Sequence, residues 1–239
     1  MFFVYCGVKI HYELKGKGKV CLFLHGWGQD GKAFSLIQSK LNGYAWLTVD
    51  LPPFGESEEP ENWTIFTYAN MVISLCEHLN IKTCNVIGHS FGGRIGLIMS
   101  SLTPQFVNKL ILLDSAGMKP KRNLKYHFSV LKYKIFKLLN ILQENAGSSD
   151  YKALNPKCRS TFVSVVNTFL EEYCYQIKAP TLIIFGKQDE VTPLYMAKRL
   201  NRLIKSSTLD IVDHAGHFCY EDRPIKIAEI ISCFLEEEK

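Results

Sequence analysis

The sequence Gly88-His89-Ser90-Phe91-Gly92 carries the strongest structural signal in this chain. It follows the short run 84–87, which predicts a buried strand, and precedes 93–99, which predicts a helix. A serine on such a sharp strand-to-helix turn projects its hydroxyl above the sheet edge, and the flanking glycines relieve crowding. Backbone N–H groups at the helix start would point at an anion forming beside the serine. The pattern predicts a nucleophile at Ser90, with an ordinary turn as the alternative.

On both sides of this turn the sequence alternates between predicted strands and predicted helices. Continuous apolar strands joined by helices predict an α/β fold, with a mostly parallel sheet of about eight strands and helices on both of its faces. In such sheets, ligands gather at the carboxyl ends of the strands. The predicted strands are an N-terminal strand within 1–7 and then 8–14, 20–24, 45–49, 84–87, 109–113, 181–185 and 208–212. The predicted helices are 32–40, 66–79, 91–101, 193–203 and 224–235.

One long segment interrupts this alternation. Residues 115–179 contain no convincing strand, but they show helical patterns around 124–142 and 157–173. An insertion of this length within an α/β domain usually serves function. We therefore predict a core formed by 1–114 and 180–239, with 115–179 as a helical cap inserted before the penultimate strand and covering the strand ends.

Bulk composition is that of an ordinary globular protein: of 239 residues, 47% are hydrophobic and 21% are charged. No apolar run approaches the roughly 20 residues that span a bilayer. The N-terminal residues lack a basic region and a cleavage site, which favours a first strand over a signal peptide. Eight scattered cysteines without a C-x-x-C pair favour reduced thiols and a cytoplasmic protein, and argue against a metal site.

The net charge of +5 is unevenly distributed. One segment of the predicted cap combines basic residues with aromatic ones and contains no acidic residue. Two interpretations stay open: the solvated face of an amphipathic helix, or a surface that attracts anionic ligands or membranes. Of these interpretations, membrane association is the less favoured one. The absence of a recognised nucleic-acid motif argues against nucleic-acid binding. The basic residues are Lys119, Lys121, Arg122, Lys125, Lys132, Lys134 and Lys137.

A serine hydroxyl needs a base to remove its proton, so Ser90 requires a histidine partner. His217 directly follows the last predicted strand and precedes the last predicted helix, which places it on a loop at the same sheet edge as Ser90. His214 lies on the same loop and is the main alternative. His89 is adjacent to the serine, but we expect its side chain to face away from it.

The base in turn needs a carboxylate that fixes its tautomer and stabilises the imidazolium. Asp189 follows the predicted strand 181–185 and is the favoured residue, although it could instead cap the helix that starts near Pro193. Asp114, which ends another strand, and the adjacent Glu190 remain alternatives. The chain order serine, aspartate, histidine fits this type of site.

Backbone donors must also stabilise the negative oxygen that develops during attack. One is expected from Phe91, the residue after the nucleophile. The other is expected from Trp27, in the loop His25-Gly26-Trp27-Gly28 that follows an early strand. His25 is expected to shape this loop by hydrogen bonding. The side chains of Trp27, Phe91 and Phe218 predict an apolar substrate site.

Several motifs in the chain resemble those of α/β-hydrolases and stand in the same order. The chain is most similar to small-cap carboxylesterases such as the pimeloyl-ester carboxylesterases, and it also resembles carbon–carbon bond hydrolases. One departure is Pro53-Phe54, where many relatives have Gly-His; we expect it to alter a loop only. The motifs are 24–28, 50–57, 88–93, 186–189 and 216–218, with Glu221 and Pro224 after them.

The resemblance implies an α/β-hydrolase fold and hydrolysis of a small-molecule ester or thioester through an acyl-enzyme, without a cofactor. Two alternatives remain: a carbon–carbon bond hydrolase of ring-fission products, and a ligand-binding or receptor module with little turnover. Substrate choice depends on pocket volume and on cap side chains, which the order of the helices does not determine. The sequence pattern gives no oligomeric state.

Overall fold

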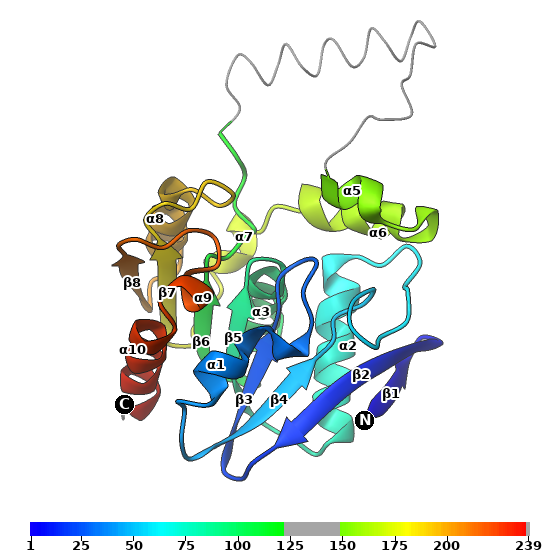
Figure 1. Ribbon diagram of the computed structural model, residues 1–239, viewed down its shortest axis with the longest axis horizontal. Coiled ribbons are helices and arrows are strands. Elements are labelled where there is room, and N and C mark those ends of the chain that lie inside the picture. Colours follow the sequence, from blue (N-terminus) through cyan, green and yellow to red (C-terminus); the bar gives the residue numbers. More distant parts are fainter. Residues whose placement is uncertain (122–148, 238–239) are drawn as a thin grey trace, which may run out of the picture.

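The computed structural model describes residues 1–121 and 149–237, and an eight-stranded sheet forms its centre (Figure 1). The strands are arranged in the order β1-β2-β4-β3-β5-β6-β7-β8. They are β1 (Phe2–Tyr5), β2 (Val8–Lys15), β3 (Lys19–Leu24), β4 (Tyr44–Val49), β5 (Cys84–His89), β6 (Val107–Leu113), β7 (Thr181–Gly186) and β8 (Ser207–Val212). Each predicted strand is confirmed to within two residues at either end, and the N-terminal residues form the first strand.

The sheet is mostly parallel, as predicted. Strands β1 and β2 pair antiparallel to each other, and β2 also pairs antiparallel to β4; every other neighbouring pair is parallel. Leu24 at the end of β3 is opposite Gly88 in β5, and His89 is opposite Leu113 at the end of β6. The loops that follow β3, β5, β6, β7 and β8 therefore start at one edge of the sheet, where ligand sites of such folds form.

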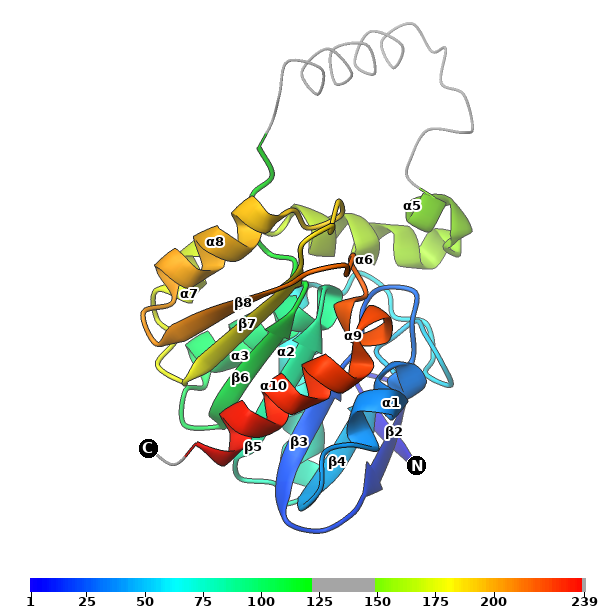
Figure 2. The same cartoon turned by 60° about the vertical axis from the view of Figure 1, so that its left-hand side comes forward.

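Helices cover both faces of the sheet (Figures 1 and 2). Buried side chains of α2, α3 and α8 join the apolar cluster on one face, and those of α1, α9 and α10 join the cluster on the other. The helices are η1 (Gly31–Phe34, a 3₁₀ turn), α1 (Ser35–Gln38), α2 (Ile65–His78), α3 (Phe91–Leu102), α5 (Ser149–Ala153), α6 (Pro156–Asn167), α7 (Glu171–Cys174), α8 (Leu194–Leu203), α9 (Cys219–Asp222) and α10 (Pro224–Glu236).

Local side-chain signals set where several helices begin. Thr64 caps α2, because its hydroxyl accepts from the N–H of Thr67 while the Thr67 hydroxyl accepts from the N–H of Thr64. Asn155 caps α6 with a single bond, because its side-chain oxygen accepts from the Lys157 N–H, and proline is at the first helical position. Helix α3 starts without such a cap, directly after Ser90. In its first turn the Gly92 N–H donates to the His25 oxygen, and the Phe91 N–H has no acceptor among the described residues.

Helices α5, α6 and α7 lie between β6 and β7, within the segment 115–179 predicted as a cap. In Figure 1, α5 and α6 lie above the carboxyl edge of the sheet. The helix predicted over 157–173 is in fact two helices, and the chain turns at 168–170, where the Leu170 N–H donates to the Gly117 carbonyl at 2.8 Å. The helix predicted around 124–142, and five of the seven basic residues of the cap segment, lie outside the described residues.

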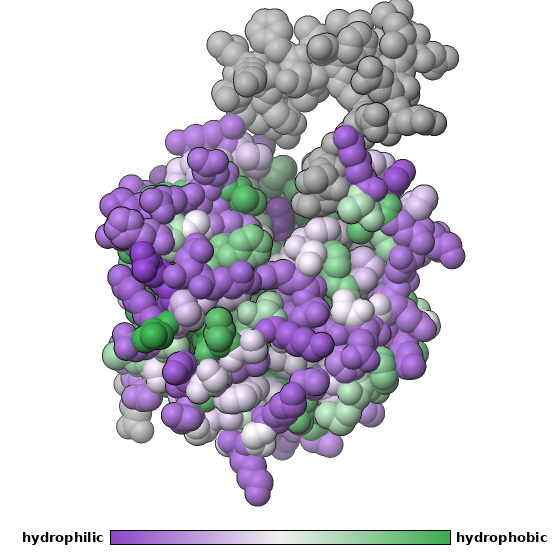
Figure 3. Space-filling view, viewed as in Figure 1, coloured by the Kyte–Doolittle hydropathy of each residue, from purple (hydrophilic) through white to green (hydrophobic). Residues whose placement is uncertain are grey.

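No helix within the described parts of the chain is long and apolar enough to cross a membrane. On the face shown in Figure 3, hydrophilic residues predominate and the hydrophobic ones are scattered. Single exposed apolar residues of this kind are normal at protein surfaces.

Candidate active site

Ser90 lies on a tight turn between β5 and α3. Its φ of 46° and ψ of −103° fall in a region that non-glycine residues rarely adopt. The turn is possible because its neighbours lack side chains: a Cβ on Gly92 would be 1.9 Å from the Leu24 carbonyl oxygen, and one on Gly88 would be 2.6 Å from the Gly92 oxygen. These glycines bring the start of α3 against the end of β3, and the serine hydroxyl stays above the sheet edge.

The structure brings Ser90, His217 and Asp189 together from three separate loops. The Nε2 atom of His217 is 3.1 Å from the Ser90 Oγ, and its Nδ1 is 2.9 Å from Asp189 Oδ2. Asp189 also accepts from the N–H groups of Val191 and Thr192, at 2.8 and 2.9 Å. Because the carboxylate can only accept, Nδ1 carries the proton and Nε2 is left to accept from the serine hydroxyl.

Burial alone would raise the pKa of the Asp189 carboxyl, but hydrogen bonds from His217 and Thr192 outweigh it and hold the pKa below its usual value. Asp189 is therefore ionised at neutral pH. An ionised, buried carboxylate at this position orients the imidazole and holds the proton on its Nδ1.

The alternative residues have other environments. Asp114 is fully buried and accepts from the N–H groups of Gly186, at 2.7 Å, and Cys219, at 3.0 Å. Burial raises the pKa of Asp114 to about 7. Its carboxylate thus links the end of β7 to the start of α9. His214 and Glu190 are exposed to solvent.

The loop that contains Trp27 is fixed by His25, as expected from the sequence. The buried imidazole donates from Nδ1 to the Gly26 oxygen at 2.8 Å and accepts at Nε2 from the Leu51 N–H at 2.7 Å. Burial lowers the pKa of His25 to about 4, so the ring is neutral. The Gly92 N–H donates to the His25 oxygen at 3.1 Å, which joins this loop to α3.

The two expected oxyanion donors belong to the elements joined in this way. Within the described parts of the chain, no acceptor is found for the N–H of Trp27 or for that of Phe91. Both residues line the same cavity as Ser90, and an oxyanion site requires backbone N–H groups that are free to donate.

A further network behind the site was not foreseen in the sequence. His89, expected to face away, donates from Nε2 to the backbone oxygen of His217 at 2.8 Å. Its Nδ1 is 3.1 Å from the side-chain oxygen of Gln29, and that oxygen accepts from the Gly26 N–H and from the Tyr220 hydroxyl. These contacts join positions 60 and 128 residues apart, which no local pattern signals.

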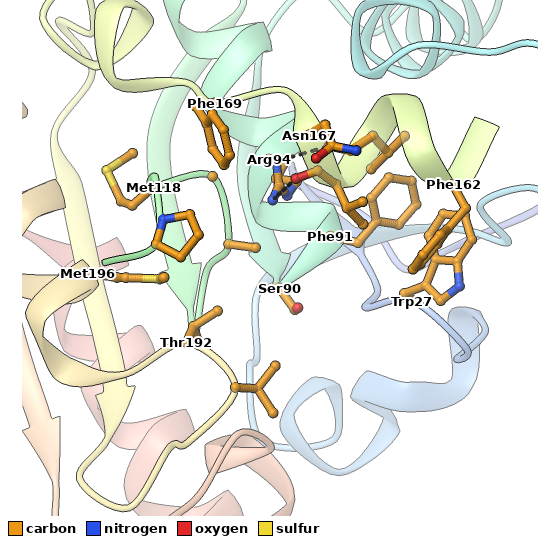
Figure 4. A pocket seen from close by; sticks show the side chains of 16 residues that line it. Trp27, Ser90, Phe91, Arg94, Met118, Phe162, Asn167, Phe169, Thr192 and Met196 are labelled. Carbon is orange, nitrogen blue, oxygen red and sulfur yellow. Dashed lines mark hydrogen bonds between the residues drawn. The ribbon is translucent and has the colours of Figure 1, made fainter. Parts of the chain in front are cut away.

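A cavity of about 400 Å³ opens above Ser90 (Figure 4). The indole of Trp27 forms one wall, and its ring centroid lies about 5 Å from those of Phe91 and Phe162. The cavity is lined by Trp27, Ser90, Phe91, Arg94, Ala116, Gly117, Met118, Pro120, Phe162, Val165, Val166, Asn167, Phe169, Val191, Thr192 and Met196.

Phe218, predicted at the substrate site, does not line this cavity. Its ring is 39% exposed and packs against His89 and His217, with centroid distances of 5.2 and 5.4 Å. Trp27 and Phe91, by contrast, both line the cavity.

Pro53-Phe54 is the local departure from the resembled motif. Phe54 makes an edge-on contact with Trp27, at a centroid distance of 5.0 Å, and its N–H donates to the Leu51 oxygen. Within the described residues, no group of three or more histidine, cysteine, aspartate or glutamate side chains is placed to hold a metal ion.

A strand-turn-helix serine, a histidine after the last strand and a mixed eight-stranded sheet define a hydrolase of the α/β-hydrolase fold. The chain belongs to that family: the family described as alpha/beta hydrolase fold matches residues 19–140 and 123–224.

Individual relatives extend over almost the whole chain. An uncharacterized hydrolase, YugF of Bacillus subtilis, is 28% identical over 96% of this chain and 95% of its own length. The 2-hydroxy-6-oxo-6-(2'-aminophenyl)hexa-2,4-dienoic acid hydrolase of Metapseudomonas resinovorans is 26% identical over 96% of this chain and 88% of its own. The structure of a thermophilic esterase from Thermogutta terrifontis has the same fold, with a TM-score of 0.77 at 19% identity over 98% of this chain and 96% of that one.

Proposed function

We propose that the protein is a serine hydrolase that cleaves carboxylic esters or thioesters through an acyl-enzyme. The observation that carries this proposal is the continuous hydrogen-bonded chain from Ser90 through His217 to Asp189, at the base of a largely apolar cavity. The same arrangement of roles recurs on unrelated folds, so geometry is its proper criterion.

In the first half of the reaction, His217 Nε2 takes the proton of the Ser90 hydroxyl as its oxygen attacks the substrate carbonyl carbon. The N–H groups of Trp27 and Phe91 stabilise the resulting oxyanion, and Asp189 stabilises the imidazolium. His217 then gives the proton to the departing alcohol or thiol. The acyl group is left bonded to Ser90.

In the second half, water replaces the alcohol. His217 removes a proton from the water, whose oxygen attacks the acyl carbon, and returns that proton to the Ser90 oxygen as the bond to the acyl group breaks. One ester and one water thus become one acid and one alcohol. We assign the segment 115–179 as the cap that closes the substrate cavity, because Phe162 and Val165 from this segment form part of its wall.

A fluorophosphonate probe tests this mechanism. The wild-type protein should be labelled at Ser90 and should lose turnover of p-nitrophenyl acetate, whereas Ser90→Ala should show neither labelling nor turnover. Ser101→Ala is the matched control, because Ser101 lies near the other end of α3 and bonds the Gln176 side chain. Full turnover by Ser90→Ala would rule the proposal out.

Carbon–carbon bond hydrolysis is the second candidate, supported by the similarity to the dienoic acid hydrolase of Metapseudomonas resinovorans. It predicts turnover of a ring-fission dienoate at rates far above those for simple esters, measured by loss of the dienoate absorbance. Ester turnover alone would exclude it.

A further inference from the structure

The cavity above Ser90 has a single charged side chain among its described lining residues, that of Arg94. The side chain is 8% exposed and lies among aromatic and aliphatic groups (Figure 4). Burial lowers the pKa of Arg94 only to about 10, so the guanidinium is charged at neutral pH. A buried cation is costly unless hydrogen bonds or a counter-charge stabilise it.

Hydrogen bonds to the end of α6 stabilise this cation in part. The Nη1 atom donates to the backbone oxygens of Val165, at 3.1 Å, and Thr168, at 2.6 Å, while Nη2 is 3.4 Å from the oxygen of Val166. A guanidinium has five N–H donors. The three carbonyl groups therefore occupy three of these donors, and the remaining N–H groups of Arg94 can bind a further acceptor in the cavity.

No described carboxylate is in contact with Arg94. Glu171 lies near enough to raise the pKa of the guanidinium somewhat, against the larger effect of burial. Its own carboxylate, however, contacts Arg199 Nη1 at 3.4 Å and accepts from the Lys119 N–H at 2.7 Å. The planar donor fork of arginine matches a carboxylate well, and its charge in these surroundings favours an anion.

We propose that Arg94 determines specificity by receiving a second carboxylate carried on the acyl part of the substrate. The preferred substrates are then half-esters or half-thioesters of dicarboxylic acids. This inference rests on the proposed function, and it adds the substrate class of the same site.

The position of Arg94 on the nucleophile's own helix gives the proposal a geometric consequence. Arg94 lies in the first turn of α3, which Ser90 precedes, and its backbone N–H donates to the backbone carbonyl oxygen of Ser90 at 3.3 Å. A helix rises about 1.5 Å per residue, so the two backbone positions are about 6 Å apart along a rigid element. The distance from nucleophile to cation is therefore fixed, and one acyl chain length should be preferred.

Matched substrate pairs test this. Monomethyl esters of dicarboxylic acids of increasing length are compared with neutral methyl esters in which an isopropyl group replaces the carboxylate, and hydrolysis is followed by pH-stat titration. The measured quantity is the ratio of kcat/KM for the charged ester to that for its neutral counterpart. We expect the wild-type ratio to exceed one and to peak at one chain length.

Variants separate recognition from a purely structural role. Arg94→Gln should lower the peak ratio by roughly 10- to 100-fold, the factor that a hydrogen bond to a charged group represents. Arg94→Lys should keep part of the ratio, because it keeps the charge. Arg202→Gln, which removes an exposed arginine outside the cavity, should leave the ratio unchanged. Loss of kcat/KM for both esters in equal proportion in Arg94→Gln would mean that Arg94 only holds α6, and would overturn the proposal.

Inhibition of the wild-type protein gives a readout that needs no variant. Free dicarboxylates should inhibit p-nitrophenyl acetate turnover more strongly than monocarboxylates of equal length. Equal inhibition, or a wild-type ratio at or below one for every chain length, would also overturn the proposal. If Ser90-dependent turnover is present without this preference, only the inference about Arg94 fails; if no ester is hydrolysed through Ser90, the proposed function fails.

Discussion

Asp114 and Asp189 are the same residue type at the ends of neighbouring strands, yet their surroundings give them different properties. Asp114 is fully buried and accepts from the backbone N–H groups of Gly186 and Cys219 and from the Cys219 thiol, and burial raises its pKa to about 7. Asp189 accepts from the His217 imidazole, and its hydrogen bonds keep its pKa low despite burial. The first carboxylate organises backbone, whereas the second is oriented toward a titratable ring.

Asparagine substitutions should separate these two roles. Asp189→Asn should lower kcat for p-nitrophenyl acetate by about 10⁴-fold, because the amide favours the wrong imidazole tautomer. Asp114→Asn should retain kcat per folded molecule but reduce the free energy of unfolding by about 1–3 kcal/mol, since its NH₂ group would face one of two buried N–H donors. Steady-state kinetics measure kcat, and urea unfolding measures the free energy of unfolding. If Asp114→Asn lost kcat while Asp189→Asn lost only stability, the roles assigned to the two carboxylates would have to be exchanged.

For single residues, the sequence predicted positions that depend only on the neighbouring strand. Ser90, Asp189 and His217 each follow a strand that could be recognised from its apolar run, and parallel strands bring their carboxyl ends to one edge. Phe218 does not line the cavity above Ser90, and its place beside His89 and His217 depends on how distant loops pack. The contact of His89 with the His217 backbone was missed for a related reason: it depends on how two distant loops pack.

At the level of helices and strands, the carboxylate of Asp50, directly after β4, holds three segments of the chain together. Asp50 accepts from the Gly31 N–H at 2.7 Å, from the Glu56 N–H at 2.9 Å and from His11 Nδ1 at 2.9 Å. Burial would raise the pKa of Asp50, but these hydrogen bonds together lower it below its ordinary 3.8. Leu51, the next residue, donates its N–H to His25, so the same strand end also supports the loop of Trp27.

The lowered pKa of Asp50 makes its contribution to stability depend on pH. The unfolded chain binds the proton more tightly than the folded one, so the stabilisation is fully present above pH 3.8 and is lost as the pH falls through the lower folded value. Asp50→Asn should therefore be less stable than wild type at neutral pH, and the difference should shrink in acid. Urea unfolding across this range checks it, with the exposed Asp210→Asn as control; a constant difference would contradict the linkage.

The ends of helices and strands could be predicted from the sequence where they depend on caps and apolar runs within the same segment of the chain. The strands and the long helices α2, α3, α8 and α10 were predicted almost to the residue. The break between α6 and α7 was not, because the Leu170 N–H turns to the Gly117 carbonyl, a partner from a distant segment. Local helical periodicity cannot register such a competing tertiary bond.

At the scale of the whole molecule, helix α6 is fastened to the core along its length. Near its start the Cys158 thiol donates to the Pro60 oxygen, and in its middle Thr161 accepts from the Trp63 N–H at 3.0 Å. Phe162 packs against Trp27, and Arg94 binds its last carbonyl groups. One wall of the substrate cavity thus depends on contacts outside that cavity.

Removing the central attachment should loosen this helix. Thr161→Val keeps the side-chain shape but leaves the buried Trp63 N–H without its acceptor, which costs about 1–3 kcal/mol. Hydrogen exchange should become faster in α6, and the midpoint of thermal unfolding should fall. Val163→Thr, on the exposed side of the same helix, should change neither; unchanged exchange in Thr161→Val would show that the attachment is dispensable.

The segment between β6 and β7 leaves the sheet at the carboxyl end of one strand and rejoins it at the amino end of its parallel neighbour. Strands β6 and β7 are hydrogen-bonded neighbours, and the Asp114 N–H donates to the Ile184 oxygen where the segment departs. Because the pairing of these two strands fixes both attachment points, the segment between them can change its length and composition over evolutionary time without altering the distance between those points. Selection could therefore remodel the walls that meet the substrate while the strand ends keep serine, histidine and aspartate in register, so that new specificities arise on an inherited reaction centre.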